Sequence, residues 1–289
     1  MNHQARPPEG RAEVRVARAT AHGVERLVCL KRLARDAGAD RIEALREEAR
    51  ILAAIRHANV VAALGFEQDE DGALLVLELV EGLDLAALRK GLGEQRLADP
   101  VAVHVACSLL RALGAAAHAV PGLVHRDVTP HNVLLSVHGE VKLADFGIAL
   151  AGDRPRSTQP LLVKGKVGYM SPEQIVGDEL DARSDLFAVG IILYELLTGV
   201  RPWAPVRGMA ELQAVIDRSP TPVLVRRPDV DRSLAAAIER LLAREPARRY
   251  ATADDALRAL ARFGAGELGS LRLTALVAAV GARVTGEAL

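Results

Sequence analysis

The chain has 289 residues, half of them hydrophobic, and its 37 basic and 37 acidic residues give a formal net charge of zero. This length and apolar content are enough to bury a sizeable core in one large or two small domains. Because the charge is balanced, we exclude a general electrostatic attraction to nucleic acid or to an anionic membrane surface.

The cysteines and the apolar runs bear on the compartment. Cys29 and Cys107 lie in no Cys pair or Cys/His pattern of the kind that holds zinc, so we predict that both are core thiols. The N-terminus has no apolar signal region, and the longest candidate membrane run, residues 186–197, is short and contains Glu195. We therefore expect a soluble, cytoplasmic protein without a membrane segment.

The first part of the chain has strand patterns and one helix pattern. Residues 1–9 are polar and contain two prolines, which predicts an irregular start. Alternating apolar residues predict strands at 13–17 and 26–33, joined by a turn at 22–23. Apolar residues three or four positions apart predict a helix at 40–56.

The rest of the chain changes from strands to helices. Two more strands are predicted at 60–66 and 73–79, on either side of an acidic turn. The predicted helices that follow are at 83–92, 100–120, 184–197, 208–216, 233–244 and 252–263. Residues 268–282 have a weak amphipathic pattern, typical of either a short docked helix or a frayed tail. A mainly β part is therefore followed by a mainly α part.

One stretch points to a chemistry. Asp127, at the end of a His-Arg-Asp tripeptide, stands five residues before Asn132, and an Asp-Phe-Gly turn begins at Asp145. This order places three oxygen-bearing side chains where a metal ion bound to phosphate could lie. Either tripeptide alone is common, so the specificity of the signal comes from the order and spacing of the whole set. We interpret the stretch as a phosphoryl-transfer signature.

Three further segments complete a family resemblance. They are Val28–Lys31, Ser171–Glu173 and Asp185–Gly190. Together with the two motifs above they resemble, over residues 10–262, the protein kinase family: the strand with the nucleotide lysine, the end of the activation segment and the start of the central helix of the large lobe. The run Tyr-Met-Ser-Pro-Glu-Gln resembles one branch of bacterial eukaryotic-like serine/threonine kinases.

The resemblance implies an α+β fold of two lobes. The small, mainly antiparallel β lobe with one key helix would be residues 10–80, and the larger, mainly α-helical lobe residues 81–268. Residues 1–9 would be an irregular N-terminus, and residues 269–289 a C-terminal tail or short helix. The implied activity is transfer of the ATP γ-phosphate to a serine or threonine hydroxyl, with ATP and Mg²⁺ as cofactors.

The same resemblance implies the partners. The substrate would be a protein, self-phosphorylation is possible, and no nucleic-acid partner is expected. The oligomeric state stays open.

The resemblance also implies the roles of the catalytic residues. Lys31 would bind the α and β phosphates and be held by Glu48, with Glu47 as the alternative if the helix register differs. Asp127 would accept or orient the proton of the acceptor hydroxyl, and Asn132 and Asp145 would hold Mg²⁺. His125 and Phe146 would be structural, anchored by Asp185, and Glu173 with Arg249 would form the buried ion pair that fixes the activation segment.

The nucleotide site is implied in the same way. Backbone groups at Glu78 and Val80 would bind the adenine, and Asp84 would reach the ribose. The residues implied to enclose the adenine are Val14, Cys29 and Leu134, and Gly10 is the one glycine that remains in the phosphate loop.

Three departures from the family pattern separate two interpretations. Gly10 stands alone where kinases carry three glycines, Thr129 replaces a lysine, and Lys166 replaces a threonine. The last two are features of the bacterial branch. From the first we expect weak ATP binding, either because the natural start lies upstream or because the protein has become a pseudokinase that acts as a scaffold. An active kinase is the first interpretation and the scaffold is the alternative.

A regulatory site is also predicted. Arg126 precedes the catalytic aspartate and could pair with a phosphate on the segment between the Asp-Phe-Gly turn and Ser171. Ser157 and Thr158 are the candidate acceptors in that segment, and an unmodified surface loop is the alternative.

Overall fold

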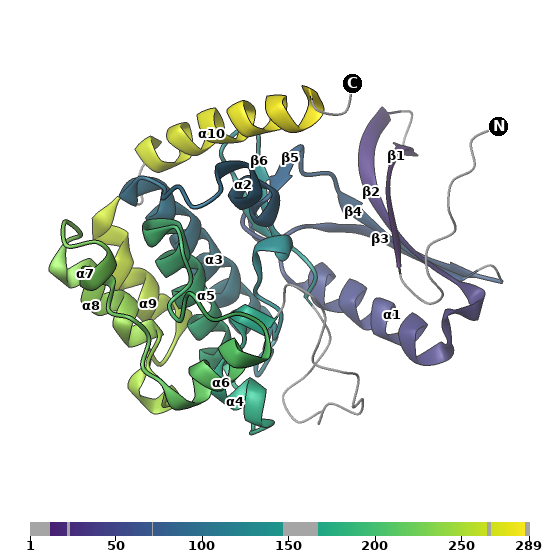
Figure 1. Ribbon diagram of the computed structural model, residues 1–289. Helices are drawn as coiled ribbons and strands as arrows, with labels where there is room; N and C mark the ends of the chain where they lie inside the picture. The colour runs from purple at the N-terminus through teal and green to yellow at the C-terminus, as the bar shows by residue number, and fades with distance from the viewer. Residues whose placement is uncertain (1–11, 22–23, 71, 147–166, 265–266, 287–289) are drawn as a thin grey trace.

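The computed structural model describes residues 12–21, 24–70, 72–146, 167–264 and 267–286. These residues form two lobes, with a sheet and one helix at the N-terminal side and a mainly helical body at the C-terminal side (Figure 1). The bilobal α+β architecture expected from the sequence is thereby confirmed.

The small lobe is a four-stranded antiparallel sheet with the order β1-β2-β4-β3. Its strands are β1 (Glu13–Ala21), β2 (Val24–Ala34), β3 (Ala63–Asp69) and β4 (Gly72–Glu78). The register pairs Val14 with Lys31, and Cys29 with Val16 on one side and Leu77 on the other. Because paired residues in a sheet share a face, Val14 and Cys29 lie on the same face as Lys31.

The helix of the small lobe is α1 (Ala39–Ala54), which packs on β3 and β4. Its buried residues include Leu45, Ala49 and Leu52, which recur at the helical period, and each buried leucine contributes about 1.5–3 kcal/mol. Glu48 lies on the same buried side. A carboxylate there needs a partner, because an unpaired buried charge is costly.

The large lobe contains nine described helices. They are α2 (Leu85–Leu92), α3 (Asp99–Ala119), α4 (Pro172–Val176), α5 (Ala182–Thr198), α6 (Met209–Asp217), α7 (Val223–Arg226), α8 (Arg232–Leu241), α9 (Ala253–Leu260) and α10 (Glu267–Gly286). The centre is the pair α3 and α5, which pack together and are buried along most of their length. Their apolar residues point in all directions, as expected of core helices.

One helix among the described residues, α3, is long and apolar enough to cross a membrane, and 72% of its most apolar window is buried inside the fold. A second candidate exists only if α9 and α10, which are bent by 86°, are counted as one span. The prediction that residues 186–197 are the longest such run was therefore wrong, because the apolar residues of α3 extend further along the chain.

A second sheet combines the short strand after β4 with the two strands that follow the catalytic loop. It consists of β5 (Gly82–Asp84), β6 (Val133–Ser136) and β7 (Val141–Leu143), in that order and antiparallel. After β7 the backbone N–H of Ala144 donates to the carbonyl oxygen of Asn132 at 2.9 Å. The β6–β7 hairpin thus folds the chain back, so that Asn132 and Asp145 come close in space.

Helix α10 packs across α2, α3, β5 and β6 through the buried residues Leu273, Val277 and Val280 (Figure 1). The described part of the C-terminal stretch is therefore a docked helix. A Cβ on Gly91 of α2 would lie 2.5 Å from a methyl group of Val280, so this contact requires glycine.

Candidate functional site

Lys31 connects the two lobes. Its Nζ donates to Glu48 Oε1 and Oε2 at 2.9 and 2.8 Å and to Asp145 Oδ1 at 2.7 Å. An ammonium group has three N–H donors, so these bonds use all of them. The neighbour Glu47 instead pairs with Arg50 at 3.2 Å, which identifies Glu48 as the glutamate that meets Lys31.

The charges around Lys31 keep it protonated. Burial alone would lower the pKa of Lys31, but the carboxylates of Asp145 and Glu48 outweigh burial and raise this pKa. Lys31 is therefore a permanent cation at neutral pH, in a position where phosphate oxygens could replace Asp145 as its third acceptor.

Asn132 fixes the catalytic loop from within. Its Nδ2 donates to the backbone oxygen of Asp127 at 2.8 Å and to Asp127 Oδ2 at 2.9 Å. Both hydrogens of the amide group are used in this way, so its oxygen Oδ1 points away from Asp127. The amide therefore orients the Asp127 carboxylate and presents an oxygen of the type that hard cations bind.

The carboxylate of Asp185 anchors the backbone of the catalytic loop. It accepts the backbone N–H of His125 at 2.7 Å and that of Arg126 at 2.9 Å. Complete burial raises the pKa of Asp185 to about 7, although these two bonds favour the ionised form. Asp185 stands 60 residues after His125 in the sequence, and it anchors the two residues directly before Asp127.

Both ring nitrogens of His125 form hydrogen bonds with the backbone. The backbone N–H of Asp127 donates to His125 Nδ1 at 3.3 Å, so Nδ1 is an acceptor and the proton is on Nε2. Nε2 then donates to the backbone oxygen of Ala144 at 3.1 Å. The ring also meets Phe146 edge to face, with 4.6 Å between centroids, and Phe146 is buried.

Backbone strain is concentrated at this site. Among the described residues other than glycine, positive φ occurs at Arg126 (62°) and Asp145 (53°). The left-handed region costs an ordinary residue on the order of 1 kcal/mol, and such strain persists only where surrounding bonds hold it. Arg126 directly precedes Asp127, and Asp145 is itself one of the groups that carry the phosphoryl-transfer signature.

Arg249 and Glu173 form the predicted ion pair. Arg249 Nη1 and Nη2 donate to the two oxygens of Glu173 at 2.6 and 2.8 Å, and Ser184 Oγ donates to the same carboxylate at 2.7 Å. The remaining Arg249 donors bind the backbone oxygens of Arg183, Ala243 and Arg244. Burial opposes ionisation of Glu173, but the bonds from Arg249 and Ser184 outweigh it and lower its pKa.

The predicted adenine contacts divide into two groups. Val14 is 63% exposed, whereas Cys29 and Leu134 are partly buried. Of the two thiols expected in the core, Cys107 is fully buried and Cys29 only partly. The contact of these three residues with a nucleotide stays a prediction.

The backbone at the end of β4 is partly engaged within the small lobe. The backbone N–H of Glu78 donates to the backbone oxygen of Ala62 at 3.0 Å, so this donor is engaged within the small lobe, and a contact of Glu78 with adenine stays a prediction. The contact of Val80 with adenine also stays a prediction. Asp84 accepts the backbone N–H of Ala87 at 2.7 Å, so its observed role is the N-cap of α2, and its contact with a ribose stays a prediction.

Two polar contacts were missed by sequence reasoning. Glu78 Oε1 accepts from Lys142 Nζ at 2.9 Å and so links β4 to β7. Gln174 Nε2 donates to the backbone oxygen of Arg126 at 2.9 Å, while its Oε1 completes a capping box with Ser171. The Ser-x-x-Gln spacing is a signal for the box, but nothing local indicates the contact with Arg126.

Some predicted positions lie outside the described residues. They are Gly10, Ser157, Thr158 and Lys166, together with the turn at 22–23. Thr129 is described and is buried.

Comparison with known proteins gives a consistent result. Residues 12–259 match the family described as protein kinase domain. The chain is 37% identical over 267 residues to "Tyrosine-protein kinase MasK" of Myxococcus xanthus, covering 88% of this chain and 41% of that protein. It is 39% identical over 241 residues to "Serine/threonine-protein kinase PknL" of Mycobacterium bovis, covering 80% of this chain and 57% of that protein.

The fold has a solved counterpart. The kinase domain of Mycobacterium tuberculosis PknI superposes with a TM-score of 0.64 at 23% identity, covering 89% of this chain and 92% of that one. The chain spans about half the length of the curated relatives it matches.

Proposed function

Because the chain belongs to the protein kinase family, we propose that it transfers the γ-phosphate of ATP to a serine or threonine hydroxyl of a protein substrate. The observation that carries this proposal is the three-way contact of Lys31 with Glu48 and Asp145. It joins the nucleotide strand, the helix of the small lobe and the Asp-Phe-Gly turn in one arrangement. Such an arrangement gives no reason to prefer the pseudokinase alternative.

Each residue then has a defined task. Lys31 would bind the nucleotide phosphates, and Glu48 would keep it in place. Asp127 would orient the acceptor hydroxyl and accept its proton, with its carboxylate held by Asn132. Phosphoryl transfer demands positioning and charge stabilisation rather than covalent work from the protein, and these groups supply both.

Members of the family use ATP and a divalent metal ion, and we propose that the ion is Mg²⁺. The donor set fits such an ion, because Asn132 Oδ1 points away from Asp127 and Asp145 is a carboxylate. Mg²⁺, when bound, would neutralise charge on the phosphates. Asn132 and Asp145 are the residues that would hold it.

The compartment of the reaction and the bounds of the kinase domain are also proposed. We propose that the reaction takes place in the cytoplasm, where ATP is available, and that the kinase domain comprises residues 10–268. Adenine contacts through Glu78, Val80, Val14, Cys29 and Leu134 are part of it. We also propose self-phosphorylation at Ser157 or Thr158, with Arg126 pairing with the phosphate that is added.

Tyrosine is the second candidate acceptor, because one relative is named a tyrosine-protein kinase and another a serine/threonine-protein kinase. The test is incubation of the purified protein with labelled ATP and Mg²⁺, followed by identification of the phosphorylated amino acid. We expect labelled serine or threonine in the wild type and none in Asp145→Ala. Labelled tyrosine alone would contradict the serine/threonine assignment, and equal labelling by Asp145→Ala would contradict the proposed role of that residue.

A further inference from the structure

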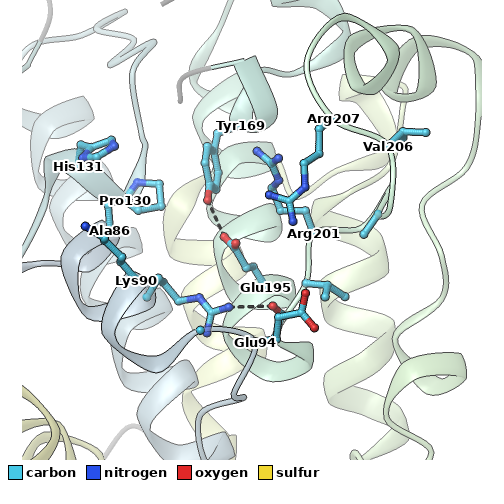
Figure 2. Close-up of a pocket in the computed structure, with 15 residues that line it drawn as sticks. Ala86, Lys90, Glu94, Pro130, His131, Tyr169, Glu195, Arg201, Val206 and Arg207 are labelled. Carbon is cyan, nitrogen blue, oxygen red and sulfur yellow. Dashed lines mark hydrogen bonds between the residues drawn. The ribbon is translucent and has the colours of Figure 1, made fainter. Parts of the chain in front are cut away.

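A pocket of about 420 Å³ opens beside the catalytic loop, and the roles proposed above do not use it (Figure 2). Its lining residues come from α2, from the loop itself, from the 3₁₀ turn η3 (Val167–Tyr169) and from the end of α5 with the segment after it. Pro130 and His131 line it and stand between Asp127 and Asn132 in the chain. A substrate whose hydroxyl reaches Asp127 would therefore have neighbouring residues within reach of this pocket.

Cationic side chains predominate in the pocket. Arg89, Lys90, Arg201 and Arg207 line it, against the carboxylates of Glu94 and Glu195. Figure 2 shows Arg201 and Arg207 beside Tyr169, and Lys90 on the side where Pro130 and His131 lie. The four cations still outnumber the carboxylates when Glu211, which pairs with Arg201 at 2.9 Å, is added.

One of the two lining carboxylates, that of Glu195, is already engaged. Glu195 Oε2 accepts from the hydroxyl of Tyr169 at 2.5 Å, and Tyr169 is buried, with burial and Glu195 both raising its pKa. The neutral hydroxyl therefore occupies an oxygen that a basic substrate side chain would need. This contact makes the pocket less suited to a basic residue than its carboxylate alone would suggest.

Among the described residues, three of the cations form no salt bridge with a carboxylate. Arg89 donates to the backbone oxygens of Gln95 at 2.7 Å and Gly199 at 2.8 Å, which position the guanidinium but carry no net charge. Lys90 and Arg207 are exposed, and within the described ranges neither forms an ion pair. An incoming anion could therefore bind Lys90 and Arg207 without breaking a described ion pair, although Arg207 also attracts the carboxylate of Glu211.

We infer that this pocket receives an acidic side chain, aspartate or glutamate, of the protein substrate close to the phosphorylated residue. The inference rests on the proposed function, because it names a substrate class for that reaction. An extended peptide advances about 3.3 Å per residue, so the acidic residue lies only a few positions from the acceptor hydroxyl. Because this contact is the same before and during transfer, it acts on KM and not on kcat.

The test uses one series of peptides with a serine acceptor and a second series with a threonine acceptor. In each series, every position up to four residues from the acceptor is in turn Glu, Gln or Lys. At one or more positions Glu should raise kcat/KM roughly threefold to tenfold over Gln through a lower KM, and Lys should reduce it. The advantage of Glu should shrink in about 1 M salt, which screens exposed charges.

Charge reversal identifies the responsible residues. In Lys90→Glu/Arg207→Glu the preference should change from Glu peptides to Lys peptides, with kcat on the Gln peptide unchanged. Arg232→Glu, an exposed arginine on α8, is the matched control and should keep the wild-type preference. Thermal unfolding of all variants shows whether each one is folded.

The outcomes separate the two proposals. Equal kcat/KM for Glu and Gln at every position, with transfer to the peptides intact, would overturn the acidic subsite and leave the proposed function standing. A preference for Glu that persists in the folded double variant would also overturn it. Transfer to no peptide and to no residue of the protein itself would contradict the proposed function, and the subsite with it.

Discussion

The side-chain amide of Gln174 donates a hydrogen bond to the backbone oxygen of Arg126 at 2.9 Å, which joins the start of α4 to the catalytic loop. Arg126 has a φ of 62°, and its N–H is bound to Asp185 at 2.9 Å. A strained residue is thus held at both of its peptide groups, directly before Asp127. We infer that Gln174 positions Asp127 without touching the substrate.

Gln174→Glu separates this role from helix capping. Glutamate keeps the acceptor that completes the capping box with Ser171, but it has no N–H for the Arg126 carbonyl. Since one hydrogen bond contributes about 1 kcal/mol, kcat should fall roughly fivefold, with the KM for ATP nearly unchanged and the unfolding temperature lower by only about 2–4 °C. Gln213→Glu on α6 is the control, and an unchanged kcat in Gln174→Glu would show that the contact is incidental.

Glu48 and Glu47 form a natural matched pair. Glu48→Gln removes the charge that faces Lys31, so the KM for ATP should rise roughly tenfold or more. Glu47→Gln changes only an exposed contact with Arg50 and should leave the KM for ATP unchanged. Steady-state kinetics with varied ATP measures both. An equal effect of the two substitutions would contradict the assignment of Glu48.

Arg249→Lys tests the buried ion pair. Lysine cannot replace the five directed donors of the guanidinium, so Glu173 would be left partly unpaired in the interior. The free energy of unfolding should decrease by about 3 kcal/mol, as measured by urea denaturation. The neighbouring exposed Arg248→Lys should change it by less than about 0.5 kcal/mol, and a similarly small effect at position 249 would be evidence against the pair as a stabilising contact.

Asp185 predicts a pH dependence of stability. Burial raises its pKa from 3.8 to about 7, so between these values the unfolded chain is ionised at this residue while the folded chain keeps the proton. The unfolded state then binds fewer protons, and the contribution of Asp185 to stability is full below pH 3.8 and is lost as the pH rises to about 7.

The variant Asp185→Asn lacks this titration. The free energy of unfolding of the wild type minus that of the variant should therefore decrease as the pH rises through this range. The total decrease is on the order of 4 kcal/mol. Urea denaturation of both proteins at several pH values measures this difference, in which other titrating groups cancel. A difference that is constant with pH would contradict the raised pKa.

The elements that the sequence predicted well are those with a long pattern. The helix of Glu48 and the core helices α3 and α5 carry many apolar residues at a regular period, so their positions are readable to within a few residues. The short elements β6, β7, α4 and α7 were missed, because three to five residues are too few to establish a period.

The site residues also divide into those that a local motif marks and those that only tertiary contacts define. Lys31, Asp127, Asn132 and Asp145 were predictable because motif order marks them, whichever way the chain folds. The partner of the Arg126 carbonyl was not, because Gln174 is 48 residues away in the sequence and only tertiary folding brings the two together. For the same reason the sequence did not indicate that the N–H of Glu78 donates to the backbone oxygen of Ala62.

The most direct measurement of the central claim is phosphate transfer from labelled ATP by Asp127→Asn, made beside calorimetric titration of ATP into the same variant. Asn132 Nδ2 holds Asp127 in place, but Lys31, Glu48 and Asp145 do not depend on its charge. We predict that transfer falls at least about 100-fold, while the dissociation constant for ATP stays within about twofold of the wild-type value. Undiminished transfer by a folded Asp127→Asn protein would contradict the account.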